Sequence, residues 1–165
     1  MIPLLLVIAF VAFRTWTERL SPEDTVEMTS GDLEVRINYC QPAVKGRTIF
    51  GELVPYGQVW RTGANTATSI RFSRDVSLND HSLKAGKYSL WSVPEKEDWV
   101  IVINKEVGQW GTNYDDSKDV LRFSVPSKQT DTMQEMFTIS LSEGQDEQIL
   151  VNLHWDHTAV EFEVK

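Results

Sequence analysis

The stretch Trp-Val-Ile-Val-Ile-Asn, residues 99–104, carries apolar side chains on both faces of an extended chain. Successive side chains of a strand point to opposite faces, so this run suits a strand that is covered on both sides. We therefore place it at the centre of a sheet. We expect it to pair with residues 87–93 across a turn at residues 94–98, which begins with Pro94.

Apolar and polar residues alternate with a period of two through most of the chain after residue 24, and turn residues interrupt the alternation. The pattern predicts ten short strands: residues 25–29, 33–39, 68–73, 76–78, 87–93, 99–104, 120–125, 135–141, 148–155 and 159–165. The last two are expected to form a hairpin around Asp156 and His157, because one apolar face continues on both sides of this turn. The fold class is therefore all-β, an antiparallel β-sandwich or jelly-roll-like domain preceded by a short N-terminal hydrophobic helix.

The composition bounds the class of protein. The chain has 165 residues, 41% of them apolar and 24% charged, which is typical of one folded domain. We assign residues 1–20 to a hydrophobic anchor or uncleaved signal and residues 21–165 to the β-sandwich domain. The net charge is −8 and no basic run forms a cationic face, so nucleic acid is not expected as a partner. Cys40 is the single cysteine, and a buried inert thiol is expected there.

An uninterrupted apolar run, Ile-Pro-Leu-Leu-Leu-Val-Ile-Ala-Phe-Val-Ala-Phe, occupies residues 2–13. As a helix it would cover roughly 18 Å of a hydrocarbon core about 30 Å thick, so it fits a signal-peptide core or a partly inserted anchor better than a full crossing. A transmembrane helix would need extension to Trp16 or Leu20, with the Arg14 side chain reaching the headgroups. No Lys or Arg precedes the run and no small-x-small pair follows Phe13, so retention is expected rather than cleavage.

The expected location follows from this apolar segment. Contact with the lipid bilayer is predicted through residues 2–16, with the β-domain outside the cytoplasm, in the periplasm, as part of the cell envelope. The predicted anchor side chains are Ile2, Leu4, Leu5, Leu6, Val7, Ile8, Phe10, Val11, Phe13 and Trp16.

The irregular stretch at residues 41–67 is a natural place for a site on a rigid sandwich. Arg61, Thr62 and Asn65 lie close together there, in the sequence Val-Trp-Arg-Thr-Gly-Ala-Asn. An Arg beside Asn and Thr can present a fork of donors to a carboxylate or a sugar. Alternatively, Arg61 pairs with an acidic residue such as Asp119 and Asn65 satisfies loop carbonyl groups.

A second irregular stretch, residues 105–118, holds Trp110 and Tyr114 among glycine and asparagine residues. This setting makes them the most accessible of the aromatic residues, and exposed rings on a sandwich can stack on sugar rings. These two residues therefore join the candidate set for ligand or partner binding. Trp99 and Trp155 share strand faces with Ile and Val, so they are expected in the core.

No catalytic or metal-binding constellation is visible in the sequence. His154, Asp156 and His157 lie close together, but strand alternation separates their directions, and only the distant His81 offers a further ligand. The paired carboxylates at residues 115–116 lack an acid and base context. Hence no metal, no cofactor and no catalytic residue is predicted, and the sequence favours a noncatalytic protein over an enzyme.

Three blocks of sequence carry a resemblance to a known family. They are FGELVPYGQVWRTGANTAT at residues 50–68, SLKAGKYSLWSVP at residues 82–94 and NKEVGQWGTNYDDSKDVLRF at residues 104–123. Through them the chain resembles the bacterial secreted family known as domain of unknown function 2911, from residue 46 to residue 122 and more loosely beyond. The resemblance implies a β-sandwich of the bacterial cell envelope and no assigned reaction. Cys40 and Gln41 stand where the family has Ser or Gly followed by Arg, so a binding role of that arginine does not carry over.

Three functions are open at this point. The leading one is a membrane-anchored extracytoplasmic β-sandwich that serves as a noncatalytic accessory subunit of a larger membrane protein complex, respiratory or photosynthetic in type. Its partners would then be the membrane-embedded subunits of that complex. The second is a periplasmic module that binds a glycan or another small polar ligand. The third is an uncharacterised hydrolase built on the same loops.

Overall fold

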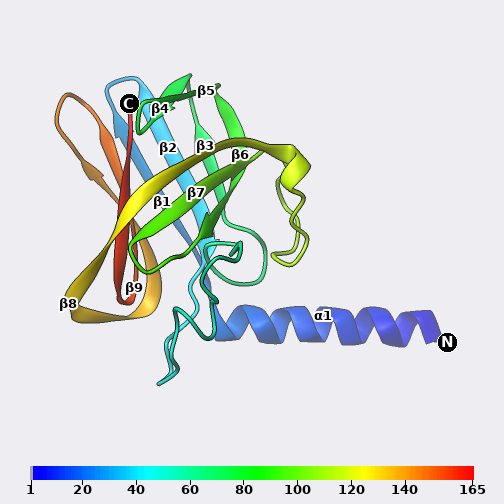
Figure 1. Cartoon of the computed structure of the whole chain (residues 1–165). Helices are drawn as coiled ribbons and strands as arrows, with labels where there is room; N and C mark the ends of the chain where they lie inside the picture. Colours follow the sequence, from blue (N-terminus) through cyan, green and yellow to red (C-terminus); the bar gives the residue numbers. More distant parts are fainter. Residues whose placement is uncertain (1) are drawn as a thin grey trace.

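The computed structural model describes residues 2–165, with side chains for residues 6–13, 15–17 and 19–165. Within these residues an α-helix precedes a β-domain, and a short 3-10 helix lies before the eighth strand (Figure 1). The elements are α1 (Ile2–Leu20), β1 (Glu23–Ser30), β2 (Leu33–Cys40), β3 (Ser69–Phe72), β4 (Val76–Leu78), β5 (His81–Leu83), β6 (Gly86–Val93), β7 (Asp98–Asn104), η1 (Asp116–Lys118), β8 (Asp119–Glu143) and β9 (Ile149–Val164).

The strands follow the order β1-β2-β3-β6-β7-β8-β9-β4-β5, and neighbouring strands pair antiparallel. β7 lies in the middle of this order, between β6 and β8, and its residues Ile101, Val102 and Ile103 are fully buried. The central place of β7 and its pairing with β6 confirm the prediction made from residues 99–104. The all-β, antiparallel, sandwich-like fold behind a short helix is confirmed as well.

β8 passes from one layer of the domain into the other, and its long ribbon bends sharply in Figure 1. Its first part, from Asp119 to Pro126, pairs with β7. Its last part, from Thr138 to Glu143, pairs with β9. The bend lies where the pairing with β9 shifts in register, between Gln129 and Thr138. One strand thus connects the two layers covalently.

Two predicted pairs of strands are single long strands. β8 joins the strands predicted at residues 120–125 and 135–141, and β9 joins those predicted at residues 148–155 and 159–165. The predicted hairpin around Asp156 is therefore wrong, because both parts of β9 pair with β8. Asp156 has a φ of 53°, and the buried side switches there from odd to even positions, so the strand turns a corner. The short strand β5 is absent from the predicted set.

A cluster of aromatic rings fills the core beneath the loop of residues 41–67. Trp60 of this loop stacks on Trp155 of β9, with ring centroids 5.7 Å apart. Trp99 of β7 meets Trp60 edge on, at 6.1 Å. The core positions predicted for Trp99 and Trp155 are confirmed, since both residues are buried. These contacts fix the loop on the sandwich, and with it the residues that follow Trp60.

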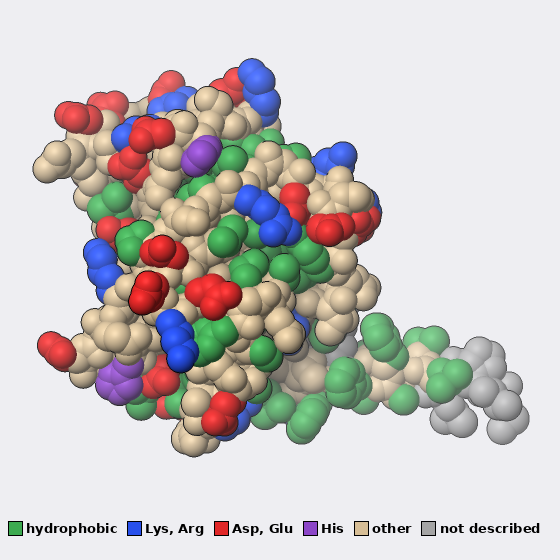
Figure 2. All heavy atoms as spheres, viewed as in Figure 1, with side chains coloured by type: hydrophobic (Ala, Val, Ile, Leu, Met, Phe, Trp, Pro, Cys, Tyr) green, Lys and Arg blue, Asp and Glu red, His purple; other side chains and the backbone are tan. Residues whose placement is uncertain are grey.

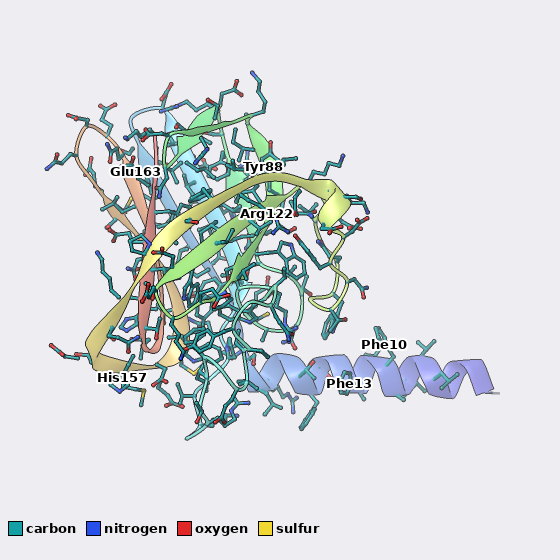
Figure 3. All side chains as sticks on the ribbon, viewed as in Figure 1. Phe10, Phe13, Tyr88, Arg122, His157 and Glu163 are labelled. Atoms are coloured by element: carbon teal, nitrogen blue, oxygen red, sulfur yellow. The ribbon has the colours of Figure 1, made fainter. Side chains whose placement is uncertain are left out.

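α1 extends away from the β-domain (Figure 1), and Figure 3 shows Phe10 and Phe13 on its outlying part. Hydrophobic side chains line this arm, whereas charged side chains are spread over the visible face of the β-domain (Figure 2). The exposed apolar residues of α1 are Leu6, Val7, Ile8, Phe10, Val11, Phe13, Trp16 and Leu20. The predicted anchor residues Ile2, Leu4 and Leu5 lie outside the described side chains. Of the helices in the described part of the chain, none combines the length and the apolar character that a membrane crossing requires.

Candidate functional site

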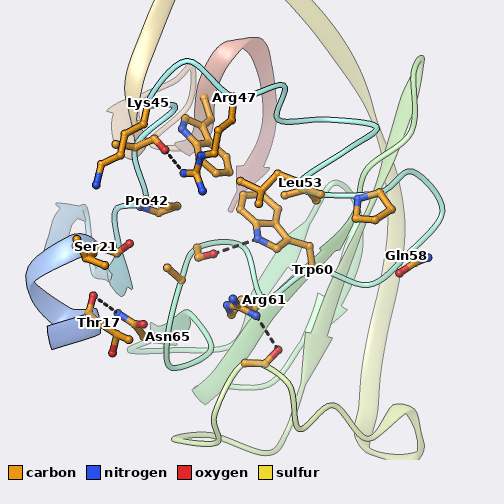
Figure 4. Close-up of a pocket in the computed structure, with 18 of the residues that line it drawn as sticks. Thr17, Ser21, Pro42, Lys45, Arg47, Leu53, Gln58, Trp60, Arg61 and Asn65 are labelled. Carbon is orange, nitrogen blue, oxygen red and sulfur yellow. Dashed lines mark hydrogen bonds between the residues drawn. The ribbon is translucent and has the colours of Figure 1, made fainter. Parts of the chain in front are cut away.

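A pocket of about 440 Å³ lies where the loop of residues 41–67 meets the C-terminal end of α1 (Figure 4). α1 contributes Thr17 and Leu20 to its wall, and Trp60 and Trp155 contribute aromatic surface. The remaining lining residues are Ser21, Pro42, Ala43, Lys45, Arg47, Leu53, Val54, Pro55, Gln58, Val59, Arg61, Gly63, Ala64, Asn65 and Gly111. The helix, the first long loop and the second loop therefore meet at one site.

The pocket wall is positively charged. Lys45, Arg47 and Arg61 line it, and no Asp or Glu is among its described lining residues. None of these three cations takes part in an ion pair between side chains that the structure describes. The carboxylate of Glu135 accepts a hydrogen bond from the backbone N–H of Lys45 at 2.9 Å. In a chain of net charge −8, such a concentration of positive charge makes this pocket more favourable to anions than the acidic remainder of the surface.

Two of the three cations lie at the exposed rim of the pocket. Lys45 is exposed, so its ammonium group keeps its contact with water. Arg47 is also exposed, but its guanidinium donates to the backbone carbonyl of Val44 at 3.1 Å and to that of Ala43. Arg47 therefore braces the loop while its charge remains at the pocket mouth.

Arg61 is the most enclosed of the three cations. Its Nη1 donates to the Gly111 carbonyl at 3.4 Å, and its Nε is buried without a hydrogen-bond partner among the described residues. Burial lowers the pKa of the Arg61 guanidinium, because removal from water disfavours the charged form, while the neighbouring Cys40 acts in the opposite direction. An arginine nevertheless stays protonated. A half-buried cation without a carboxylate partner stands to gain from an incoming anion.

A strained turn fixes the direction of Arg61. Thr62 and Asn65 have φ angles of 52° and 58°, a region that is costly for a β-branched residue such as Thr62. Thr62 is fully buried, with its hydroxyl 2.9 Å from that of Ser92. Its carbonyl accepts a hydrogen bond from the Thr68 hydroxyl at 2.6 Å. These contacts hold the turn in its strained form, and strain of this kind concentrates at functional sites.

Gly111 makes room for the Arg61 side chain. A Cβ atom at position 111 would overlap Arg61 Cδ and would lie 2.8 Å from the Asn65 carbonyl oxygen. Gly111, Lys45 and Arg47 are missing from the site residues predicted from the sequence. The only sequence signal for the two rim cations is the Lys-Gly-Arg triplet in the same loop as Arg61.

The pocket brings together part of the predicted set. Arg61 and Asn65 both line it, and Thr62 is buried next to them. Asn65 Nδ2 donates to the Thr17 carbonyl at 3.4 Å, so it satisfies a carbonyl group of α1 instead of one in its own loop. The alternative pairing of Arg61 with Asp119 is wrong, because Asp119 pairs with a different arginine at 2.7 Å.

Trp110 and Tyr114 lie outside this pocket wall, and both are half-buried. Tyr114 packs on Trp91, with ring centroids 4.9 Å apart. Its hydroxyl donates to Asp119 at 2.6 Å and accepts from Arg122 at 2.7 Å. Burial, together with the Asp119 carboxylate, raises the pKa of Tyr114 well above its usual range. The two predicted aromatic residues are thus not part of the pocket lining, although Trp110 directly precedes Gly111, whose carbonyl accepts a hydrogen bond from Arg61.

The histidines predicted not to bind metal belong to two other places. His154 and His157 both contact Thr130 at the corner of β8 and β9, at 3.0 Å and 2.9 Å. His81 stacks against Phe123, with ring centroids 5.8 Å apart. Among the described residues, no group of three or more His, Cys, Asp or Glu side chains is arranged to hold a metal ion.

A family model described as a protein of unknown function (DUF2911) matches residues 21–164. The chain belongs to the DUF2911 family. The resemblance carried by the three sequence blocks is thereby confirmed. No curated protein and no solved structure matches the chain. The DUF2911 match contains all three cations of the pocket, whereas α1 precedes it.

Proposed function

We propose that this DUF2911 domain is a noncatalytic binding module for a small ligand that carries a carboxylate or phosphate group. The observation that carries the proposal is the pocket wall, which contains Lys45, Arg47 and Arg61 and no acidic side chain among its described residues. We further propose that α1 holds the module at a membrane of the cell envelope, with the β-domain in the periplasm. The exposed apolar side chains of α1 support this placement.

Arg61 is expected to contribute most of the electrostatic binding energy. Exposed ion pairs contribute only about 0–1 kcal/mol, because water screens them. Two opposite charges about 4 Å apart attract each other by about 4 kcal/mol at an effective dielectric constant of about 20, which suits a partly enclosed pair. Lys45 and Arg47 are exposed and Arg61 is half-buried. An ion pair between the ligand and Arg61 is therefore expected to be stronger than one with Lys45 or Arg47.

The other lining residues favour binding over chemistry. A volume of about 440 Å³ is in the range of pockets that enclose small ligands. Leu20 and Leu53, which are partly exposed, offer apolar surface to an apolar part of the ligand. Asn65 and Gln58 offer amide groups. Neither an imidazole nor a carboxylate is among the described lining residues, so Lys45 is the one described lining side chain of a type that commonly acts as a general acid or base.

Calorimetric titration of the full chain tests the proposal. Inorganic phosphate, glycerol phosphate and succinate serve as probes of the two anionic groups. We expect Arg61→Gln to weaken the binding of the best probe by about thirtyfold, which corresponds to about 2 kcal/mol for a hydrogen bond to a charged group. Arg36→Gln is the matched control, because Arg36 is exposed and pairs with Glu27 at 3.3 Å. Equal affinities of the two variants would contradict the proposal.

A second candidate is supported by α1 itself. Its exposed apolar residues also suit packing against the membrane-embedded subunits of a larger complex, for which the domain would be an accessory subunit of respiratory or photosynthetic type. Purification of the native protein from membranes in mild detergent, followed by mass spectrometry, tests this role. Recovery of the protein only as a free monomer would count against it.

A further inference from the structure

We infer that the anionic group bound in this pocket is the phosphate of an anionic phospholipid, and that the pocket mouth rests on the same bilayer surface that receives α1. The inference rests on the proposed function and names the source of its ligand. The end of α1, the rim cations and the loop around Leu53 then form one lipid-facing surface.

The first support is the position of the pocket along α1. Exposed apolar residues continue along the helix to Trp16, and Thr17 and Leu20, directly after them, line the pocket. Tryptophan side chains prefer the level of the lipid headgroups. Leu20 lies only about 6 Å further along the helix, at about 1.5 Å per residue. Each headgroup layer is roughly 5–8 Å thick, so the pocket mouth is within reach of lipid phosphates.

The second support is the apolar character of the pocket rim. Leu20 and Leu53 both line the pocket, although they are 40% and 45% exposed. Tyr56, on the same loop as Leu53, is exposed as well. A soluble inorganic anion offers such residues no partner, whereas a phospholipid brings hydrocarbon next to its phosphate. The combination of an apolar rim with a cationic wall therefore favours an amphiphilic ligand.

The third support is the charge of the remaining surface. The whole chain has a net charge of −8, so most of its surface is repelled by an anionic bilayer. Basic residues attract anionic lipids only within a short distance of the membrane. Attraction is therefore expected near Lys45, Arg47 and Arg61 and at Arg19, an exposed cation near the end of α1. Each single substitution in the pocket is expected to weaken it.

Vesicle flotation with the full chain tests the inference. One set of vesicles contains phosphatidylcholine alone, and a second contains phosphatidylcholine mixed with phosphatidylglycerol. We expect about tenfold tighter binding to the mixed vesicles, given the attraction of basic residues to anionic lipid. Arg61→Gln is expected to lower this preference by about fivefold, because one basic residue near the membrane surface is removed from the pocket wall.

Two further variants keep the test decisive. Lys45→Gln changes an exposed residue of the pocket wall, so it reports on the preference even where Arg61→Gln fails to fold. Arg36→Gln, away from the pocket lining, is expected to keep the full preference. A preference that neither pocket variant lowers would overturn the inference, because it would come from nonspecific attraction.

Soluble probes separate this inference from the proposed function. Titration with inorganic phosphate is run on the same variants. Equal binding of the unchanged protein to both kinds of vesicle, together with phosphate binding that depends on Arg61, would overturn the lipid inference and leave the proposed function in place. Absence of any Arg61-dependent binding, to phosphate or to anionic vesicles, would overturn both.

Discussion

Gly111 and Arg61 come from different loops, 50 residues apart in the sequence, and meet side by side. The Arg61 side chain occupies the space that any larger residue at position 111 would fill. The position of this charge therefore depends on a missing side chain as much as on the arginine itself. The strained turn at Thr62 sets the direction of Arg61 from its own loop.

Gly111→Ala is expected to displace the Arg61 guanidinium from the pocket wall. The added methyl group overlaps Arg61 Cδ, and overpacking of this kind costs about 1–3 kcal/mol. We expect urea titration to show this loss of stability and calorimetry to show weaker anion binding. Gly108→Ala is the control, because Gly108 has open space around its Cβ position and only its φ of 82° is unfavourable. Unchanged anion binding in Gly111→Ala would contradict the role of Gly111.

Tyr39 gives the chain a pH-dependent stability. Burial raises the pKa of Tyr39 to about 12, the Asp24 carboxylate adds to the rise, and the N–H of Ile139 that donates to its hydroxyl opposes it. The unfolded phenol has a pKa of about 10, so the stabilising contribution is complete below about pH 10 and is lost as the pH approaches 12. We expect the free energy of unfolding to fall across this interval, and to fall less steeply in Tyr39→Phe.

Urea titrations at several pH values measure this difference. Tyr56→Phe is the control, because Tyr56 is exposed, and its curve is expected to follow that of the unchanged protein. Parallel curves for Tyr39→Phe and the unchanged protein would show that Tyr39 does not carry the effect.

Part of the site could be predicted from residues alone. Arg61 and Asn65 are conspicuous because two side chains that donate hydrogen bonds lie close together in one loop. Lys45 and Gly111 are not conspicuous, because their roles depend on which loops meet in space. For Tyr114 the sequence is misleading. Its glycine-rich surroundings predict a ring that a ligand can reach, whereas its hydroxyl is hydrogen-bonded to Asp119 and Arg122.

The corner shared by β8 and β9 is the element that the sequence pattern describes least well. A switch of the buried side from odd to even positions fits either a tight turn or a bulge within one strand. In β9 the switch follows Asp156, but β9 continues as one strand that pairs with β8, and the register between them shifts on both sides of the pair Gln134–Asp156. Whether the switch is a tight turn or an irregularity within one strand depends on where the partner strand β8 lies. The alternation within residues 148–165 does not specify that position. β7 could be predicted because burial on both faces leaves few alternatives.

Substitutions of Asp156 test the backbone at this corner. Its φ of 53° suits glycine and strains a β-branched residue. We expect Asp156→Gly to raise the free energy of unfolding by up to about 1 kcal/mol, and Asp156→Val to lower it by about 1–3 kcal/mol. Urea titration measures both. Asp98→Val in β7 is the control, because Asp98 is an exposed residue of a regular strand, and an equal loss there would contradict the explanation.

At the scale of the whole molecule, the buried core is formed without α1. The core cluster among the described residues begins at Leu33, and the apolar side chains of α1 remain exposed. The alternating pattern after residue 24 is sufficient to predict an all-β domain, and the apolar run at residues 2–13 is sufficient to predict the hydrophobic helix before it. It was not sufficient to predict the pocket between them, because Thr17 and Leu20 join the wall only through the way the helix meets the loop.

Removal of residues 1–20 is expected to leave the β-domain folded. We expect the melting temperature to fall by no more than about 3 °C, since the core keeps its residues. Binding to phosphatidylcholine vesicles is expected to be lost, because the exposed apolar residues are removed with α1. Circular dichroism and vesicle flotation measure the two effects. A much larger fall in melting temperature would show that α1 stabilises the core.

The place of β1 at the edge of the sheet has a mechanical consequence. β1 follows α1 after Ser21 and Pro22, and in the strand order it has β2 as its single neighbour. α1 lies across the direction of β1 in Figure 1, so tension on the helix pulls at one end of the β1 ladder. Hydrogen bonds loaded from one end break one after another, each at low force. Tension on α1 would therefore detach β1 from β2 gradually, before any force reaches the central strand β7.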